Sequence, residues 1–319
     1  MSFITDRDKA GTLITGAASK GVSVALFCTG SYWNTEAIIR AADAFAREHS
    51  IEQIPVVVAM TSHYSHMQQT VRATRSGSHE IGFLTLLEYC RALTEGPYAP
   101  YPNVAAMTHL DHGDPKADVW ELTECTDMLS SVMFDAQAYP YEENVKMTRE
   151  YVRKYGDRVL VEGIVESLAV GDGTKAAQRD DYVEKAVAFI KDTGVDFLVA
   201  DLGTEQQSTG TEAKYLKGRA QALTKELGRS MLVLHGVSSL KDEDISGFGE
   251  DGVVRVNMWT RIVRESGRYA AARIGERKAL IAANDFEATE ATAYINDNID
   301  EAARIMHDIM GQLGYANLA

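Results

Sequence analysis

Three residues with acid–base or metal-binding side chains lie within four positions in the stretch HLDHG, residues 109–113. The stretch contains His109, Asp111 and His112, and it ends an apolar segment. Strand alternation alone would place His109 and Asp111 on one face and His112 on the other. Such groups need partners when buried, so they make poor core material. Two hypotheses follow: a polar loop at a strand end, or a metal ligand beside a proton-transferring carboxylate.

The composition is that of an acidic globular protein. The chain has 319 residues, of which 45% are hydrophobic, and a formal net charge of -14. Nucleic acids and anionic membranes favour clustered Lys and Arg, so neither is expected as a partner. Apolar runs stay shorter than the ~20 residues that span a bilayer, and early charges argue against a signal peptide. Three cysteines without CxxC spacing, Cys28, Cys90 and Cys125, fit a reduced cytoplasmic protein.

Short apolar segments alternate with longer amphipathic ones along the chain. Eight segments are predicted to be strands: 22–27, 53–60, 103–110, 130–135, 158–165, 195–200, 230–236 and 252–258. Stretches between them, such as 180–194, carry apolar residues at helical spacing. Near-continuous apolar strands covered by helices imply parallel pairing, and eight such units predict a (β/α)₈ TIM barrel. A doubly wound sheet is the alternative, but its GxGxxG turn is missing after the first strand.

Residues 1–319 are expected to form one barrel domain, without a linker or an internal repeat. The segment 265–319 is Ala-rich and helical, and it contains no further strand. We expect it to extend the last helix and to pack on a second subunit of a homo-oligomer, either a dimer or a tetramer.

In a TIM barrel the active site lies at the C-terminal ends of the strands. His112 and His235 both lie at such ends, and together they are candidate ligands for Zn²⁺, which needs about three protein ligands and an open position. Asp111 is the candidate for proton transfer; the alternative is that it orients a histidine. The loops after strands seven and eight offer candidate phosphate-binding residues, although helix capping would explain the same residue types. These residues are Gly236, Ser238, Asn257 and Thr260.

Five stretches together carry a family resemblance: HLDHG, SVMFDAQAYPYEENVKMTREYV, VDFLVADLGTEQQ, LVLHGVSS and VRVNMWT. In this order and spacing they resemble the class II (metal-dependent) fructose-bisphosphate and tagatose-bisphosphate aldolases, from about residue 20 to 275. The resemblance implies a (β/α)₈ fold, a zinc ion, and cleavage or formation of a carbon–carbon bond through an enediolate. By the same match, Asp111 resembles the proton donor, His112 and His235 resemble zinc ligands, and Asn257 and Thr260 resemble substrate-phosphate residues.

The chain also departs from the family pattern. Gln206 stands where the family's GTAHG has a zinc histidine, so Glu205 or Glu166 could supply a carboxylate ligand instead. A shell with a carboxylate would accept Mn²⁺ or Mg²⁺ as well as Zn²⁺. Asp172 is the nearest equivalent of the family's proton-abstracting carboxylate. Ser62, His63 and Gly203 complete the set expected to bind substrate.

The leading hypothesis is a metal-dependent lyase that cleaves or forms a carbon–carbon bond in a ketose or a sugar-acid derivative. The departures suggest a small sugar or sugar-phosphate substrate other than fructose 1,6-bisphosphate. Two alternatives stay open: a non-catalytic ligand-binding barrel, motivated by Gln206, and an isomerase or epimerase that uses the same enediolate.

Overall fold

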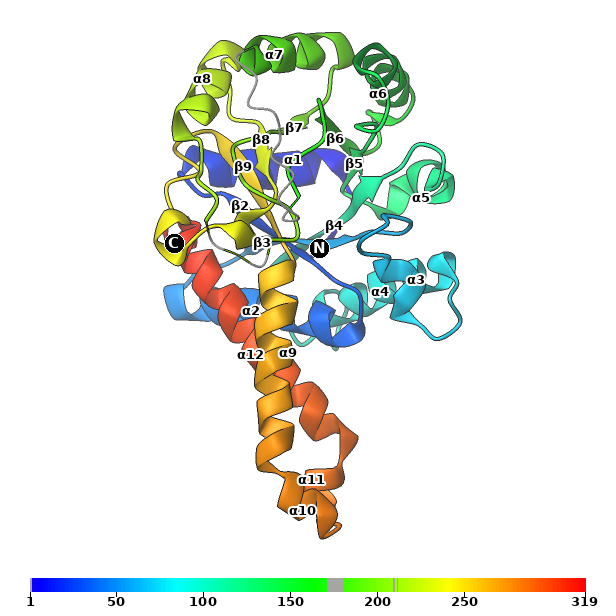
Figure 1. Cartoon of the computed structure of the whole chain (residues 1–319), viewed down its shortest axis with the longest axis vertical. Coiled ribbons are helices and arrows are strands. Elements are labelled where there is room, and N and C mark those ends of the chain that lie inside the picture. The colour runs from blue at the N-terminus through cyan, green and yellow to red at the C-terminus, as the bar shows by residue number, and fades with distance from the viewer. Residues whose placement is uncertain (1, 171–180, 209, 211) are drawn as a thin grey trace.

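The computed structural model describes residues 2–170, 181–208, 210 and 212–319. Eight parallel strands form a closed barrel, because each pairs with the next along the chain and the last pairs with the first. The strands are β2 (Val24–Cys28), β3 (Ile54–Met60), β4 (Val104–Gly113), β5 (Ser131–Phe134), β6 (Leu160–Ile164), β7 (Phe197–Val199), β8 (Leu232–Leu234) and β9 (Val253–Met258). The predicted (β/α)₈ TIM barrel is therefore confirmed (Figure 1).

Helices connect the strands and cover the outside of the barrel (Figure 1). They are α2 (Tyr32–His49), α3 (Gln69–Ala73), α4 (His79–Thr94), α5 (Val119–Thr123), α6 (Tyr141–Tyr155), α7 (Tyr182–Thr193), α8 (Lys217–Leu227) and α9 (Thr260–Glu276). Capping residues explain where several of these helices begin or end. Ser31 and Ser78 cap the backbone N–H groups that begin α2 and α4, and Gly194, at φ 74°, ends α7 in the left-handed conformation.

Residues 2–19 of the chain lie at the end of the barrel where its strands begin. Strand β1 (Phe3–Ile4) pairs in parallel with the first half of β4, and helix α1 (Arg7–Ser19) contacts β2, β6 and β9. Because these strands lie on different sides of the barrel, α1 covers its N-terminal end. The opposite end, where the predicted functional residues lie, stays accessible.

The centre of the barrel holds a buried polar cluster beneath the C-terminal end. Arg255 forms an ion pair with Glu162 and donates to Ser131 Oγ at 3.0 Å. His109 Nδ1 lies 2.7 Å from the same hydroxyl. All four side chains are buried, so charge pairing and hydrogen bonds are what make their burial tolerable.

The C-terminal helices form an arm that extends from the barrel (Figure 1). Helix α9 continues into α10 (Lys278–Ala282) and α11 (Phe286–Thr289), and α12 (Ala291–Gln312) returns beside α9 to pack on α2. The large apolar residues of α12 from Ile299 onward, including Met306, are buried on their own chain, so this part of the helix is not free for a second subunit. Other large apolar side chains of the arm are exposed: Tyr269, Ile274, Leu280 and Phe286. No helix among the described residues is long and apolar enough to cross a membrane.

Candidate active site

The end of strand β4 does not follow simple alternation. The pairing of β4 with β5 shifts register between Leu110 and Gly113, and His112 adopts a left-handed backbone conformation at φ 51°. This local irregularity turns His112 to the same side as Asp111. A Cβ at Gly113 would lie 2.9 Å from Leu110 Cδ2 and 3.1 Å from the Met133 carbonyl oxygen, so a larger residue there would force neighbouring groups to shift. Periodicity alone would have separated the two functional side chains.

Asp111, His112 and His235 converge at the C-terminal end of the barrel. Each offers one potential ligand atom, and these atoms lie within 4.8 Å of one another. His235 Nε2 is 4.0 Å from Asp111 Oδ1, and the two imidazole rings are 5.2 Å apart, edge to face. All three side chains are buried. The prediction that β4 and β8 bring these groups together agrees with this geometry.

His112 is held by a carboxylate and by an aromatic ring. Its Nδ1 lies 2.7 Å from Asp135 Oδ2, which leaves Nε2 for the pocket. The ring of Tyr64 stacks on the imidazole at 4.0 Å with an interplanar angle of 4°. Burial lowers the pKa of His112, but the charge of Asp111 and the hydrogen bond to Asp135 outweigh it, so the net shift is upward. The carboxylate fixes the ring and makes it more basic.

His235 is neutral over most of the pH range. Burial, only partly opposed by the charge of Asp111, lowers its pKa to about 4. Its Nε2 lies 2.9 Å from Asn257 Nδ2, and its Nδ1 lies 3.4 Å from Gln206 Nε2. A neutral imidazole accepts a hydrogen bond at only one nitrogen, so both amides cannot donate to it together. Turning the Gln206 amide would resolve the conflict, because its other partner, the hydroxyl of Tyr64 at 2.9 Å, can donate or accept.

Each carboxylate oxygen of Asp111 accepts a hydrogen bond from a neutral donor. Its Oδ1 accepts from Asn257 Nδ2 at 3.2 Å, and its Oδ2 accepts from Cys28 Sγ at 3.7 Å. Burial and the negative charge of Asp111 raise the pKa of the Cys28 thiol, which therefore stays protonated. Cys28 thus contacts the candidate proton-transfer group.

Apart from Asp135, these residues line a pocket that opens toward solvent. Gly236, Ser238, Asn257 and Thr260 all contribute to its lining, as predicted for substrate-binding residues, and Gln206 does so too. Gly236 has φ 72°, and a Cβ there would lie 2.7 Å from the Glu205 carbonyl carbon, so only glycine fits. Among the described residues, Asn257 Oδ1 is buried without a hydrogen-bond partner, which leaves an acceptor for a substrate hydroxyl.

Five other predicted residues that the structure describes lie outside this lining. Ser62 Oγ accepts from Thr70, and His63 pairs with a buried carboxylate. Gly203 packs on a neighbouring loop at φ 85°. Glu166 forms an ion pair with a lysine at 2.9 Å. Glu205 is the fifth, and its neighbour Gln206 lines the pocket instead. A sixth predicted residue, Asp172, lies outside the described residues.

Sequence reasoning did not assign roles to three residues that shape the site: Cys28, Tyr64 and Asp135. Asp135 ends a predicted strand, and this position was its only signal. Tyr64 and Cys28 carry no comparable pattern, because an aromatic ring or a thiol near a strand end is common in any core.

Comparison with known proteins agrees with this architecture. The family described as "Fructose-bisphosphate aldolase class-II" matches residues 8–317. The 6-phospho-5-dehydro-2-deoxy-D-gluconate aldolase of Shouchella clausii is 33% identical over 182 residues, which cover 56% of this chain and 60% of that protein. The fructose-bisphosphate aldolase of Streptococcus pneumoniae is 28% identical over 260 residues, covering 79% and 78%.

Solved structures share the fold. The fructose-bisphosphate aldolase of Campylobacter jejuni superposes with a TM-score of 0.75 at 14% identity, covering 100% of this chain and 97% of that chain. The YdjI aldolase of Escherichia coli K12 gives a TM-score of 0.65 at 20% identity, covering 95% and 97%. Because the family match spans nearly the whole chain, the chain belongs to the class II fructose-bisphosphate aldolase family. Membership supports a lyase of the aldolase type.

Proposed function

We propose that this chain is a metal-dependent aldolase that cleaves or forms a carbon–carbon bond in a small ketose or sugar-acid phosphate. The observation that carries the proposal is the convergence of Asp111, His112 and His235 in one buried pocket at the C-terminal end of the barrel. A carboxylate beside two histidines combines a proton-transfer group with nitrogen ligands for a divalent cation.

The donor set fits a divalent cation. His112 presents Nε2 to the pocket because Asp135 binds its Nδ1, and the low pKa of His235 keeps that imidazole neutral. A neutral imidazole has one lone pair, so a cation would replace one of the two amide contacts of His235. Replacing the contact at Nδ1 would let Gln206 turn its oxygen to the same cation. We propose His112, His235 and Gln206 as the ligands of Zn²⁺. Mn²⁺ and Mg²⁺ are further candidates, because an amide oxygen suits them. When bound, the cation would supply positive charge beside the substrate oxygens.

Asp111 is proposed as the residue that exchanges a proton with the substrate. Its two oxygens already accept from Asn257 and Cys28, so it is held in one orientation inside the pocket. Asn257 also retains a free buried oxygen, which can accept from a substrate hydroxyl. Positioning of this kind lets a side chain transfer a proton without first reorganising solvent.

Small residues and hydroxyls along one side of the pocket favour a phosphate group on the substrate. Gly236 brings backbone close to the pocket, and Ser238 and Thr260 offer hydroxyls from the loop after β8 and from the start of α9. Val237 stands where the family pattern has another glycine, and Gln206 where it has a histidine. These departures support a substrate other than fructose 1,6-bisphosphate. The name of the Shouchella relative makes phosphorylated sugar acids a class to include.

A screen for carbonyl products tests the proposal. Phosphorylated and non-phosphorylated ketoses and keto sugar acids, fructose 1,6-bisphosphate included, are incubated with the protein with and without EDTA. We expect cleavage of one substrate class into two smaller carbonyl fragments, lost with EDTA and restored by a divalent cation. An isomer of the substrate as the only product would indicate an isomerase or epimerase. Protein that neither contains nor binds a divalent cation would favour a non-catalytic barrel.

A further inference from the structure

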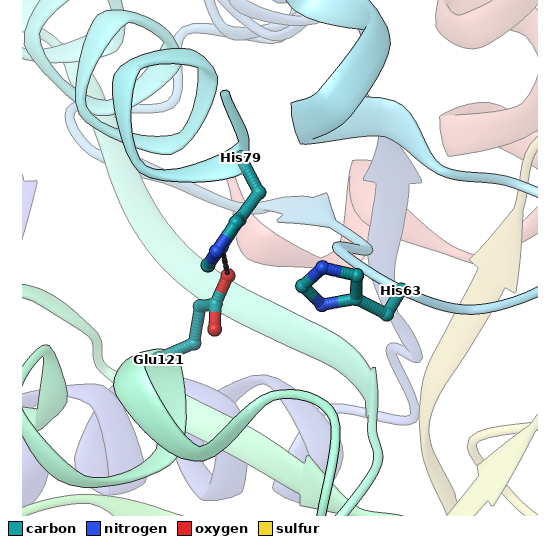
Figure 2. A group of neighbouring side chains, drawn as sticks. All are labelled: His63, His79 and Glu121. Carbon is teal, nitrogen blue, oxygen red and sulfur yellow. Dashed lines mark hydrogen bonds and ion pairs between the residues drawn. The ribbon is translucent and has the colours of Figure 1, made fainter. Parts of the chain in front are cut away.

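A second group of metal-binding side chains lies apart from the pocket. It consists of His63, from the loop after β3, His79, the first residue of α4, and Glu121 of α5 (Figure 2). Each offers one potential ligand atom, and these atoms lie within 4.8 Å of one another. We propose that this group, called here the loop cluster, binds a second divalent cation, best matched by Zn²⁺.

The spacing of the loop cluster is close to that of a filled site. His79 Nδ1 lies 2.7 Å from Glu121 Oε1, and the rings of His63 and His79 are 4.5 Å apart. Two ligands of one tetrahedral zinc ion lie roughly 3.3 Å apart, given zinc–nitrogen distances of about 2.0 Å. Movements of about an ångström would therefore convert the present contacts into ligand bonds. Figure 2 shows the three side chains converging from separate elements.

Glu121 provides the independent evidence for a missing partner. The residue is fully buried, and its Oε1 is bonded to His79. Among the described residues, its Oε2 is buried without a hydrogen-bond partner. An ionised carboxylate oxygen left unpaired away from water is unfavourable, whereas a cation satisfies both its charge and its lone pairs. A simple hydrogen-bonded His–Glu pair does not explain why this oxygen is buried.

A buried carboxylate also orients His63 as a ligand. Asp118 Oδ1 lies 2.8 Å from His63 Nδ1 and accepts the backbone N–H of the same residue at 3.0 Å. The other oxygen of Asp118 accepts the backbone N–H of Asp114 at 2.8 Å, so the carboxylate itself is fixed. With Nδ1 bonded to Asp118, Nε2 is the nitrogen of His63 that would bind a cation. A carboxylate behind a histidine is the usual support of a metal-binding imidazole.

The chemistry of the loop cluster selects its cation and gives that cation a purpose. Two imidazoles and one carboxylate form a common protein set for Zn²⁺ with a fourth position open. The side chains of His63 and His79 are 31% and 22% exposed, which provides access for the ion. His63 directly precedes Tyr64, whose ring stacks on His112 in the pocket. The cation would therefore fix the loop that places Tyr64 over the active site.

Zinc content of the purified protein tests the inference. Elemental analysis is made on the wild-type chain, on His235→Ala, which removes a ligand of the proposed active-site ion, and on His235→Ala combined with Glu121→Gln. Glutamine keeps the size of Glu121 and an acceptor for His79 but lacks the charge. His66→Ala is the matched control, because His66 is an exposed histidine on the same loop. Circular dichroism verifies that each variant is folded.

We expect two zinc ions per chain in the wild type and in His66→Ala, one in His235→Ala, and none in the double variant. Added zinc should raise the Tm of His235→Ala and leave that of the double variant unchanged. Equal zinc content in His235→Ala with and without Glu121→Gln would overturn the inference. The wild type could instead hold one ion that is kept in His235→Ala and lost when Glu121→Gln is added. That result would support the loop cluster and refute the active-site ion, so the two proposals are separable.

Discussion

Asp135 controls which nitrogen of His112 faces the pocket, and an isosteric change to asparagine tests this. Oδ2 of Asp135 contacts His112 Nδ1 at 2.7 Å and accepts from Gln137 Nε2 at 2.8 Å, while Oδ1 accepts from the backbone N–H of Gln137 at 3.2 Å. An asparagine has one oxygen and one NH₂ group. If its NH₂ group faces the Gln137 backbone, two donors oppose each other. If it faces His112, the ring proton must move to Nε2, the proposed metal-binding atom.

Asp135→Asn should therefore weaken cation binding without unfolding the barrel. The hydrogen bond to Asp135 is also one of the causes that raise the pKa of His112, so its loss makes the ligand less basic. Changes to carboxylates behind metal-binding histidines cost about 10–100-fold in affinity, or roughly 1.4–2.8 kcal/mol. Competition with a chromophoric zinc chelator measures this affinity, and far-UV circular dichroism reports on folding.

Gln137→Ala is the matched control for Asp135→Asn. It removes one neutral donor from Oδ2 but keeps the contact between Asp135 and His112, so its affinity should stay near that of the wild type. If Asp135→Asn binds zinc within about threefold of the wild type while His112→Ala loses it, the carboxylate does not set the ring proton. The proposed role of Asp135 would then be refuted.

Three further changes test other parts of the structure. Asp111→Asn should retain zinc while kcat falls by about 10²–10⁴, because the group positioned for proton transfer is lost; turnover near that of the wild type would contradict this. Glu162→Ala leaves the Arg255 guanidinium buried without its partner, which should cost about 3–5 kcal/mol and lower the Tm, whereas Glu162→Leu with Arg255→Met should recover most of it. An unchanged Tm in the single variant would show that the pair is not needed. Phe286→Asp, at a side chain 78% exposed on the arm, should weaken self-association in sedimentation runs, and a wild type that is monomeric at micromolar concentration would exclude that interface.

The barrel could be predicted from the sequence because both faces of its strands are buried. Each predicted strand overlaps an observed one, and the differences lie at the ends. Strands β2 and β4 run past their predicted bounds, to Cys28 and Gly113. The segment 195–200, for example, contains the shorter β7, Phe197–Val199. Apolar runs extend past the last ladder hydrogen bond, since residues beyond it are still covered by helices. By contrast, the arm shows that an apolar helix face does not identify its own partner. The face of α12 predicted for a second subunit is largely buried against α2 of the same chain.

The site could be predicted only where residues lie on the strand ends themselves. A barrel brings those ends together, so Asp111, His112 and His235 could be grouped from their positions. Side chains one or two residues into a loop depend on its path. This is why Gln206 lines the pocket while Glu205 does not, and why Glu166 is paired with a lysine. No periodic pattern predicts such directions.

The residue at position 206 connects these observations. A neutral glutamine is a weak ligand, so cation affinity at the proposed site would rely on how well His112 and His235 are held. His112 is held on one edge by Asp135 and on one face by Tyr64, whose hydroxyl in turn binds Gln206. The loop that carries Tyr64 is anchored where the preceding histidine bonds to a buried carboxylate. A cation bound at the loop cluster would therefore hold Tyr64 in place, and the ring of Tyr64 stacks on His112. A better-held His112 would compensate for Gln206, the weak third ligand. On this argument, Tyr64 is the residue through which the two proposed cation sites depend on each other.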